Sequence, residues 1–244
     1  MIAIETHSLS KKYKECVAVQ SLDLSIKQGE VFGLLGVNGA GKTTTIRMLT
    51  CLTKPTSGSA TVLGKNILTE PQAVKAIINL SPQETAVAPN LSVTENLELI
   101  AGIYGNSRQS AKDKVVGVVK NLGLSEVQKN KARILSGGWQ RRLSIAMALI
   151  SEPKVLFLDE PTIGLDVLAR RELWSVIERL KGEMTVILTT HYLEEAQALS
   201  DEIGIMDKGK LRALGTAAEL ISLTGAQNFE DAFIALVTKT EAEI

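Results

Sequence analysis

The start of the chain alternates between apolar and polar positions. The alternation is visible at Ile2 and Ile4 and again at Leu22, Leu24 and Ile26. A period of two is typical of strands that bury one face and expose the other. The first thirty residues therefore predict an antiparallel sheet.

Four later segments are short and almost continuously apolar, at residues 31–35, 77–80, 155–158 and 186–188. Strands of a parallel central sheet carry such runs, because both faces of the sheet are covered. We expect these four segments to form a parallel core sheet that is buried on both faces.

From about residue 90 to residue 150 the apolar positions recur at helical spacing, as at Ile145, Ala146 and Leu149. This pattern predicts a helical subdomain inserted between core strands. Residues 203–206 and 211–214 flank a turn and predict a hairpin, and about 215–244 predict a short helical tail. We expect one domain that spans residues 1–244.

The composition fits one folded domain and disfavours two classes of protein. The 244 residues suffice for a single core, and 27 basic side chains balance 27 acidic ones, which argues against disorder and against electrostatic binding of nucleic acid. Cys16 and Cys51 lack the CxxC spacing of a zinc or redox motif, so we expect a reducing cytoplasmic setting. With no apolar run near the roughly 20 residues of a membrane span and no signal-peptide pattern, we expect any membrane association to depend on a partner.

A glycine-rich segment separates the apolar run at 31–35 from a helix-compatible stretch at 44–49. It consists of Gly36, Val37, Asn38, Gly39, Ala40, Gly41, Lys42 and Thr43, and Thr44 follows it. Glycines let successive backbone N–H groups turn toward phosphate oxygens, and the helix adds its partly positive end. We predict a nucleotide-binding loop at these residues, with Lys42 on the β and γ phosphates and the Thr43 hydroxyl on Mg²⁺.

Two acidic residues, Asp159 and Glu160, directly follow the apolar run at 155–158. They fall at the carboxyl edge of the predicted sheet, where open α/β sheets place their ligands. We predict that Asp159 completes the Mg²⁺ site with Thr43 and that Glu160 polarises the attacking water as a general base. The loop and the acid pair together predict hydrolysis of a nucleoside triphosphate, but they fit a helicase, a recombinase or a DNA-repair ATPase equally well.

A third motif, Leu-Ser-Gly-Gly-Trp-Gln-Arg-Arg at residues 135–142, makes the chain resemble the ABC ATPase family, whose signature it matches. The resemblance implies a head-to-tail dimer with an identical or different ATPase subunit. In that dimer Ser136, Gly137 and Gly138 would hold the γ phosphate of ATP bound to the opposite subunit. The fifth signature position departs from the family, because Trp139 replaces the common glutamine and offers one donor and a broad apolar face. The contact made from that position stays open.

The resemblance assigns further roles between about residue 4 and residue 214. Gln83 matches the glutamine that touches Mg²⁺ and the attacking water and senses the membrane partner. Asp166 matches the acid that orders the facing site, His191 the switch histidine on the γ phosphate, and Tyr13 the aromatic that stacks on adenine. Each also has a plain structural alternative: an exposed amide, a helix N-cap, a hydrogen-bonded histidine and a tyrosine packed in the core.

Taken whole, the resemblance implies an α/β P-loop NTPase with a parallel core sheet, an N-terminal antiparallel β subdomain and an inserted α-helical subdomain. It implies an ATP- and Mg²⁺-dependent hydrolase that powers transport through separate membrane-spanning permease subunits, at the cytoplasmic face of the cell membrane and without a nucleic-acid partner. The segment at 228–236 is similar to the ending of the drug-exporter and sodium-extruder branch, which favours export. The alternative is a soluble ABC ATPase of translation or DNA maintenance, whereas a small-molecule kinase leaves the signature unexplained.

Overall fold

The computed structural model describes residues 1–238 and contains two sheets. The first is antiparallel, with the order β2-β1-β4-β5. Its strands are β1 Ile2–Tyr13, β2 Cys16–Lys27, β4 Ser57–Val62 and β5 Lys65–Asn66. The predicted antiparallel sheet is confirmed.

The alternation in β1 departs from the expected pattern at its first residue. The register with β2 shifts between Ile2 and Ile4, so that Ala3 and Ile4 are both buried while Ile2 is exposed. A bulge of this kind adds a residue to one strand and reverses the direction of the side chains beyond it. Ile2 therefore lies outside the core.

The second sheet forms the centre of the molecule, with the order β10-β9-β3-β8-β7-β6. Its strands are β3 Val31–Leu35, β6 Ile78–Ser81, β7 Val155–Asp159, β8 Thr185–Thr190, β9 Glu202–Asp207 and β10 Lys210–Gly215. All pairs are parallel except the hairpin of β9 and β10. The predicted core sheet and hairpin are confirmed, and β3, β7 and β8 are fully buried. The expectation of burial on both faces is wrong for β6, because this edge strand has β7 as its single neighbour and leaves Asn79 and Leu80 half-buried.

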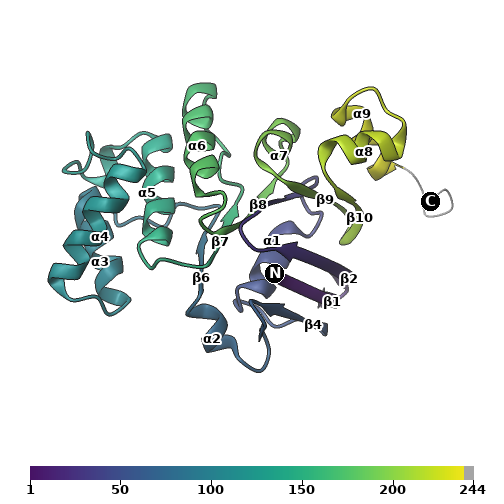
Figure 1. Cartoon of the computed structure of the whole chain (residues 1–244), viewed down its shortest axis with the longest axis horizontal. Coiled ribbons are helices and arrows are strands. Elements are labelled where there is room, and N and C mark those ends of the chain that lie inside the picture. Colours follow the sequence, from purple (N-terminus) through teal and green to yellow (C-terminus); the bar gives the residue numbers. More distant parts are fainter. Residues whose placement is uncertain (239–244) are drawn as a thin grey trace.

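Helices surround the sheets. They are α1 Lys42–Leu49, α2 Pro71–Lys75, α3 Val93–Ile103, α4 Arg108–Asn121, the 3₁₀ helix η1 Ala132–Ile134, α5 Gly137–Leu149, α6 Val167–Leu180, α7 Leu193–Leu199, α8 Ala217–Thr224 and α9 Phe229–Thr238. Figure 1 shows α3, α4 and α5 grouped at one end of the molecule, away from the antiparallel sheet and from α8 and α9. The expected tail thus contains two helices, and its residues 239–244 lie outside the described part. Within residues 1–238, no helix has both the length and the apolar character that a bilayer crossing requires.

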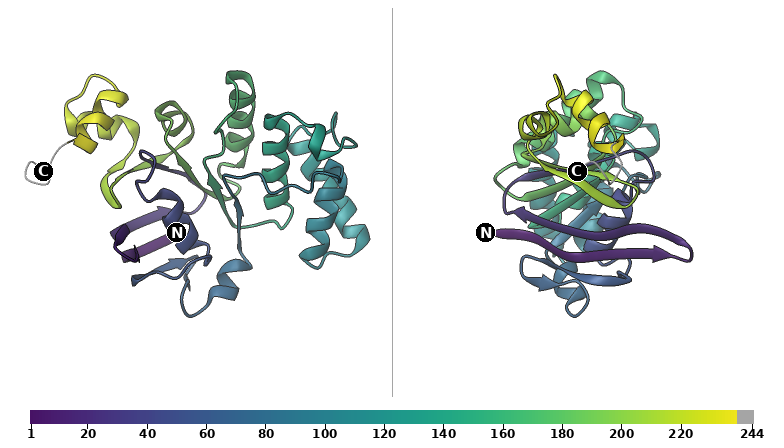
Figure 2. Two further views of the ribbon diagram at one scale, coloured as in Figure 1. Left: turned by 180° about the vertical axis from the view of Figure 1, so that it is seen from behind. Right: turned by 90° about the vertical axis from the view of Figure 1, so that its right-hand side faces the viewer.

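The core sheet is packed on both faces. Leu156, Leu158 and Leu188 point into one cluster, which includes buried residues of α3 to α6. Phe157 and Ile187, which alternate with them, point into a second cluster with α1 and the antiparallel sheet. The side view in Figure 2 shows β1 and β2 crossing below the core sheet. This sandwich leaves only the ends of the core strands free to carry a site.

Candidate active site

The glycine-rich loop connects β3 to α1, as predicted. Val37 and Asn38 are exposed, Ala40 is buried, and Thr44 is half-buried on the first turn of α1. A Cβ on Gly36 would stand 2.3 Å from the carbonyl oxygen of Met206, and one on Gly41 would stand 2.4 Å from that of Ala18. Gly41 also has φ +106°, which disfavours other residues. The loop therefore depends on its glycines for a tight turn into the helix.

Lys42 lies inside this loop. Only 5% of the residue is exposed, and its Nζ donates to the carbonyl oxygens of Gly36 at 2.7 Å and Val37 at 3.2 Å. The same ammonium group stands 3.2 Å from Oε1 of Glu160. The predicted phosphate-binding cation and the predicted base thus form a buried ion pair.

The Glu160 carboxylate is held from two sides. Its Oε1 faces Lys42, and its Oε2 shares a hydrogen bond of 2.7 Å with Nδ1 of His191. The backbone of Glu160 has φ +49°, a left-handed conformation that is rare outside glycine, and its N–H donates to the carbonyl and the hydroxyl of Thr189. Tertiary packing therefore fixes both the side chain and the turn.

Asp159 and Thr43 lie next to each other, as expected for a shared ion. The Thr43 hydroxyl donates to Oδ1 of Asp159 at 3.1 Å, and the Thr189 hydroxyl donates to the same oxygen at 2.6 Å. A hydroxyl and a carboxylate are hard oxygen ligands, and Mg²⁺ takes few ligands from the protein because it keeps several waters. Among residues 1–238 no cluster of three or more His, Cys, Asp or Glu offers a metal cage of its own. The pair fits Mg²⁺ bound together with phosphate.

The signature residues lie at the start of α5. Ser136 is the N-cap of α5, and a Cβ on Gly138 would come within 3.0 Å of the Cβ of Ala169 on α6. Within the described chain, no hydrogen bond or ion pair joins Ser136, Gly137 or Gly138 to residues 36–43. In the described part of the chain, the signature is therefore not bonded to its own phosphate loop.

Asp166 and Trp139 make contacts within their own chain. Asp166 caps α6 and accepts from the N–H of Ala169 at 2.9 Å, which is the structural alternative raised for it. The ring of Trp139 lies 4.8 Å from the guanidinium of Arg142. The indole at the fifth signature position is thus stacked against its own helix.

Tyr13 and Gln83 make no direct hydrogen bond or ion pair with Lys42 or Glu160 within residues 1–238. Tyr13 ends β1 with 43% of its surface exposed, so the alternative that it packs in the core is wrong. The ammonium of Lys11 lies 4.9 Å from its ring. The Gln83 residue is exposed, and within residues 1–238 its one hydrogen bond runs from Arg141 to its main-chain oxygen.

Arg141 has no predicted role, yet this residue is buried and bonded to the turn of the acid pair. A signal was present, because Arg141 precedes Ile145 and Ala148 by one and two helical turns and so belongs to the buried face of α5. A charged residue on a helix face directed toward the core requires buried partners.

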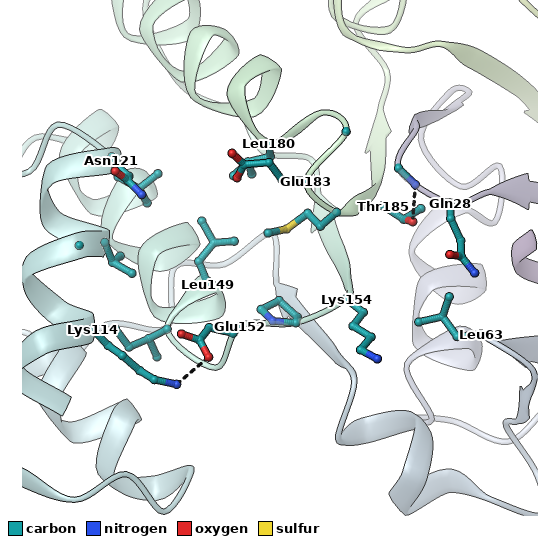
Figure 3. Close-up of a pocket in the computed structure, with 18 residues that line it drawn as sticks. Gln28, Leu63, Lys114, Asn121, Leu149, Glu152, Lys154, Leu180, Glu183 and Thr185 are labelled. Carbon is teal, nitrogen blue, oxygen red and sulfur yellow. Dashed lines mark hydrogen bonds and ion pairs between the residues drawn. The ribbon is translucent and has the colours of Figure 1, made fainter. Parts of the chain in front are cut away.

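Of two pockets, one lies outside this cluster and the other is lined in part by His191. One of about 930 Å³ opens between α4, α5 and the turn before β3, where Lys114 pairs with Glu152 at 2.9 Å (Figure 3). Lys154 and Thr185 place it at the amino ends of β7 and β8, opposite to the edge with the acid pair. A smaller pocket of about 490 Å³ lies beside His191. The larger pocket is therefore not the predicted phosphate site.

Comparison with known proteins gives a consistent result. Residues 19–163 match the family model described as ABC transporter. The chain is 41% identical to the daunorubicin/doxorubicin resistance ATP-binding protein DrrA of Streptomyces peucetius over 225 residues, which are 92% of this chain and 68% of the relative. The fold is similar to that of cbiO1 of Clostridium perfringens, part of the ABC transporter complex cbiONQ, with a TM-score of 0.84, 26% identity and coverage of 91% of each chain. It is also similar to a dimeric ATP-binding cassette in a post-hydrolysis state bound to ADP and Pi, with a TM-score of 0.79, 26% identity and coverage of 87% of this chain and 98% of that one.

Proposed function

Because the chain belongs to the ABC transporter family, we propose that it is the ATP-hydrolysing subunit of an exporter whose membrane-spanning permease subunits are separate chains. It binds and hydrolyses ATP, as ATPases of this family do. The observation that carries the assignment of residues is the cluster at the carboxyl edge of the core sheet, in which the buried Lys42 and Glu160 meet the half-buried His191. Its charges are those that phosphoryl transfer requires.

In our proposal the loop at 36–44 binds the phosphates of ATP. Phosphate oxygens are stronger acceptors for Lys42 than the loop carbonyls that it now contacts. Thr43 and Asp159 would hold Mg²⁺, which supplies positive charge against the phosphate oxygens. Glu160 takes the proton of the attacking water as the bond between the γ phosphorus and its bridging oxygen breaks. His191 keeps the carboxylate in place through its hydrogen bond.

A second ATPase subunit would complete each site. Within residues 1–238 the signature makes no hydrogen bond to its own loop, and two chains arranged head to tail would bring Ser136, Gly137 and Gly138 to the ATP of the partner. The dimeric cassette with ADP and Pi supports the formation of a dimer. Within it, Tyr13 would stack on adenine through its exposed ring, and Asp166 would order the facing site.

The permease would bind near Gln83, whose amide would sense it, and would hold the chain at the cytoplasmic face of the cell membrane. The resistance function of DrrA supports export as the direction of transport. A soluble ATPase of translation or DNA maintenance is less favoured, because the relatives above are ATP-binding proteins of drug resistance and of a transporter complex.

Co-purification tests the proposal. The tagged chain, solubilised from membranes in mild detergent, should carry a membrane-spanning protein with it, and reconstitution of that pair should raise the rate of ATP hydrolysis. The Lys42→Ala variant should keep the partner and lose the hydrolysis. Recovery of ribosomes or nucleic acid in place of a membrane protein would make the soluble alternative correct.

A further inference from the structure

Arg141 on α5 is a buried cation whose acceptors are all main-chain oxygens. Nε donates to the carbonyl of Pro161 at 2.8 Å, and Nη2 donates to that of Asp159 at 2.7 Å. Nη1 donates to the carbonyls of Pro82 and Gln83. Only 4% of the residue is exposed. One guanidinium thus joins three segments that are distant in sequence.

Two of these acceptors flank Glu160, the residue that we propose as the base. The carbonyls before and after it, at Asp159 and Pro161, both point at Arg141. Glu160 itself has the left-handed φ of +49°. Such a backbone persists only where its surroundings hold it. Arg141 supplies two of the bonds that hold this turn.

The shape of the side chain suits this task. A guanidinium is a planar fork with five N–H donors, whereas an ammonium group is a compact charge that cannot reach four diverging carbonyls. Burial lowers the pKa of Arg141 to about 10, although the negative charges of Asp159, Glu195 and Glu160 act to raise it. The group is therefore still protonated at neutral pH, with all its donors available.

We infer that Arg141 is a positioning residue for hydrolysis, which holds the turn that presents Glu160 and ties that turn to α5 and to the loop at Pro82 and Gln83. The inference rests on the proposed role of Glu160. Within residues 1–238 Arg141 donates no hydrogen bond to the loop at 36–43, so its loss should affect turnover and leave nucleotide binding intact.

The test compares Arg141→Lys with Arg179→Lys. Arg179 also donates to one main-chain oxygen, that of Asn121, but lies on the exposed side of α6. We expect Arg141→Lys to lower kcat by about 10- to 100-fold, the scale of a misplaced catalytic group. KM and the Kd for ATP should stay within about twofold, and Arg179→Lys should match the parent within the same limits, as surface contacts contribute little.

A double variant separates positioning of the base from a general structural role. In single-turnover hydrolysis, Arg141→Lys added to Glu160→Gln should cause no further loss, because the residue acts through the base. A parental kcat in Arg141→Lys, or a full additional loss in the double variant, would overturn the inference. If Arg141→Lys does not fold, the second variant is Arg141→Ala, assayed with millimolar guanidinium in place of the missing side chain. Failure of guanidinium to raise the kcat of this variant would also overturn the inference. Full activity of Glu160→Gln would instead refute the proposed base itself.

Discussion

Replacement of Glu160 by glutamine tests both the chemistry and the energetics of the buried cluster. The substitution keeps the size of the side chain and removes its charge and basicity. Loss of a positioned general base costs about 10²- to 10⁴-fold in rate, so we expect hydrolysis to fall by that factor. The loop, Thr43 and Asp159 are unchanged, so ATP should still bind, and the variant should accumulate as an ATP-bound dimer.

The same change deprives Lys42 of its carboxylate partner at 3.2 Å. Lys42 keeps the carbonyls of Gly36 and Val37, so we expect the low end of the cost of a broken charged contact, about 1–2 kcal/mol. For a chain of this length each kcal/mol shifts Tm by about 2–4 °C, which gives a loss of about 2–8 °C without nucleotide. ATP returns negative charge to Lys42, so it should raise the Tm of the variant more than that of the parent.

Phosphate release and thermal unfolding, each with and without ATP and Mg²⁺, measure these effects. The control is Glu152→Gln, whose carboxylate pairs with Lys114 at 2.9 Å but is 71% exposed, and it should change neither quantity. A parental rate in Glu160→Gln would show that another group is the base. If the Tm of Glu160→Gln equals that of the parent, and ATP raises both Tm values equally, the ion pair with Lys42 contributes no stability.

Three further changes have separate readouts. Lys42→Ala should weaken binding of a fluorescent ATP analogue by at least about tenfold, because a charge-assisted phosphate contact is lost, and unchanged affinity would contradict the phosphate loop. Ser92→Ala removes the N-cap that bonds the N–H of Glu95, and it should lower stability by about 1 kcal/mol with hydrolysis unaffected; an unaltered Tm would exclude that contribution. Burial raises the pKa of Glu195, so the folded parent keeps a proton that the unfolded chain releases above its ordinary pKa. This group therefore contributes a loss of stability as pH rises from the unfolded pKa to the raised folded pKa. Glutamine does not titrate, so Glu195→Gln removes this loss, and the Tm of the variant minus the Tm of the parent should increase as pH rises over that range. A difference that does not change with pH would contradict the raised pKa.

The local elements could be read from the chain because their causes are local. Period-two alternation, unbroken apolar runs and helical spacing reflect which faces meet water, and they anticipated both sheets and the helices from 93 to 149. The exceptions have tertiary causes. Ile2 is displaced by a bulge against β2, and β6 loses cover because it became the edge strand.

The loop at 36–44, the acid pair and the signature could be recognised from the chain alone, because each depends on residue types at fixed short spacing. Three contacts become visible only in the folded chain. Lys42 pairs with Glu160, His191 binds the other oxygen of that carboxylate, and Arg141 bonds the carbonyls on both sides of Glu160. These groups meet because β7 lies beside β8 and β8 beside β3, an order that no local pattern specifies. Contacts between residues far apart in the chain follow from how the sheet and helices pack, since the burial of each element depends on its neighbours.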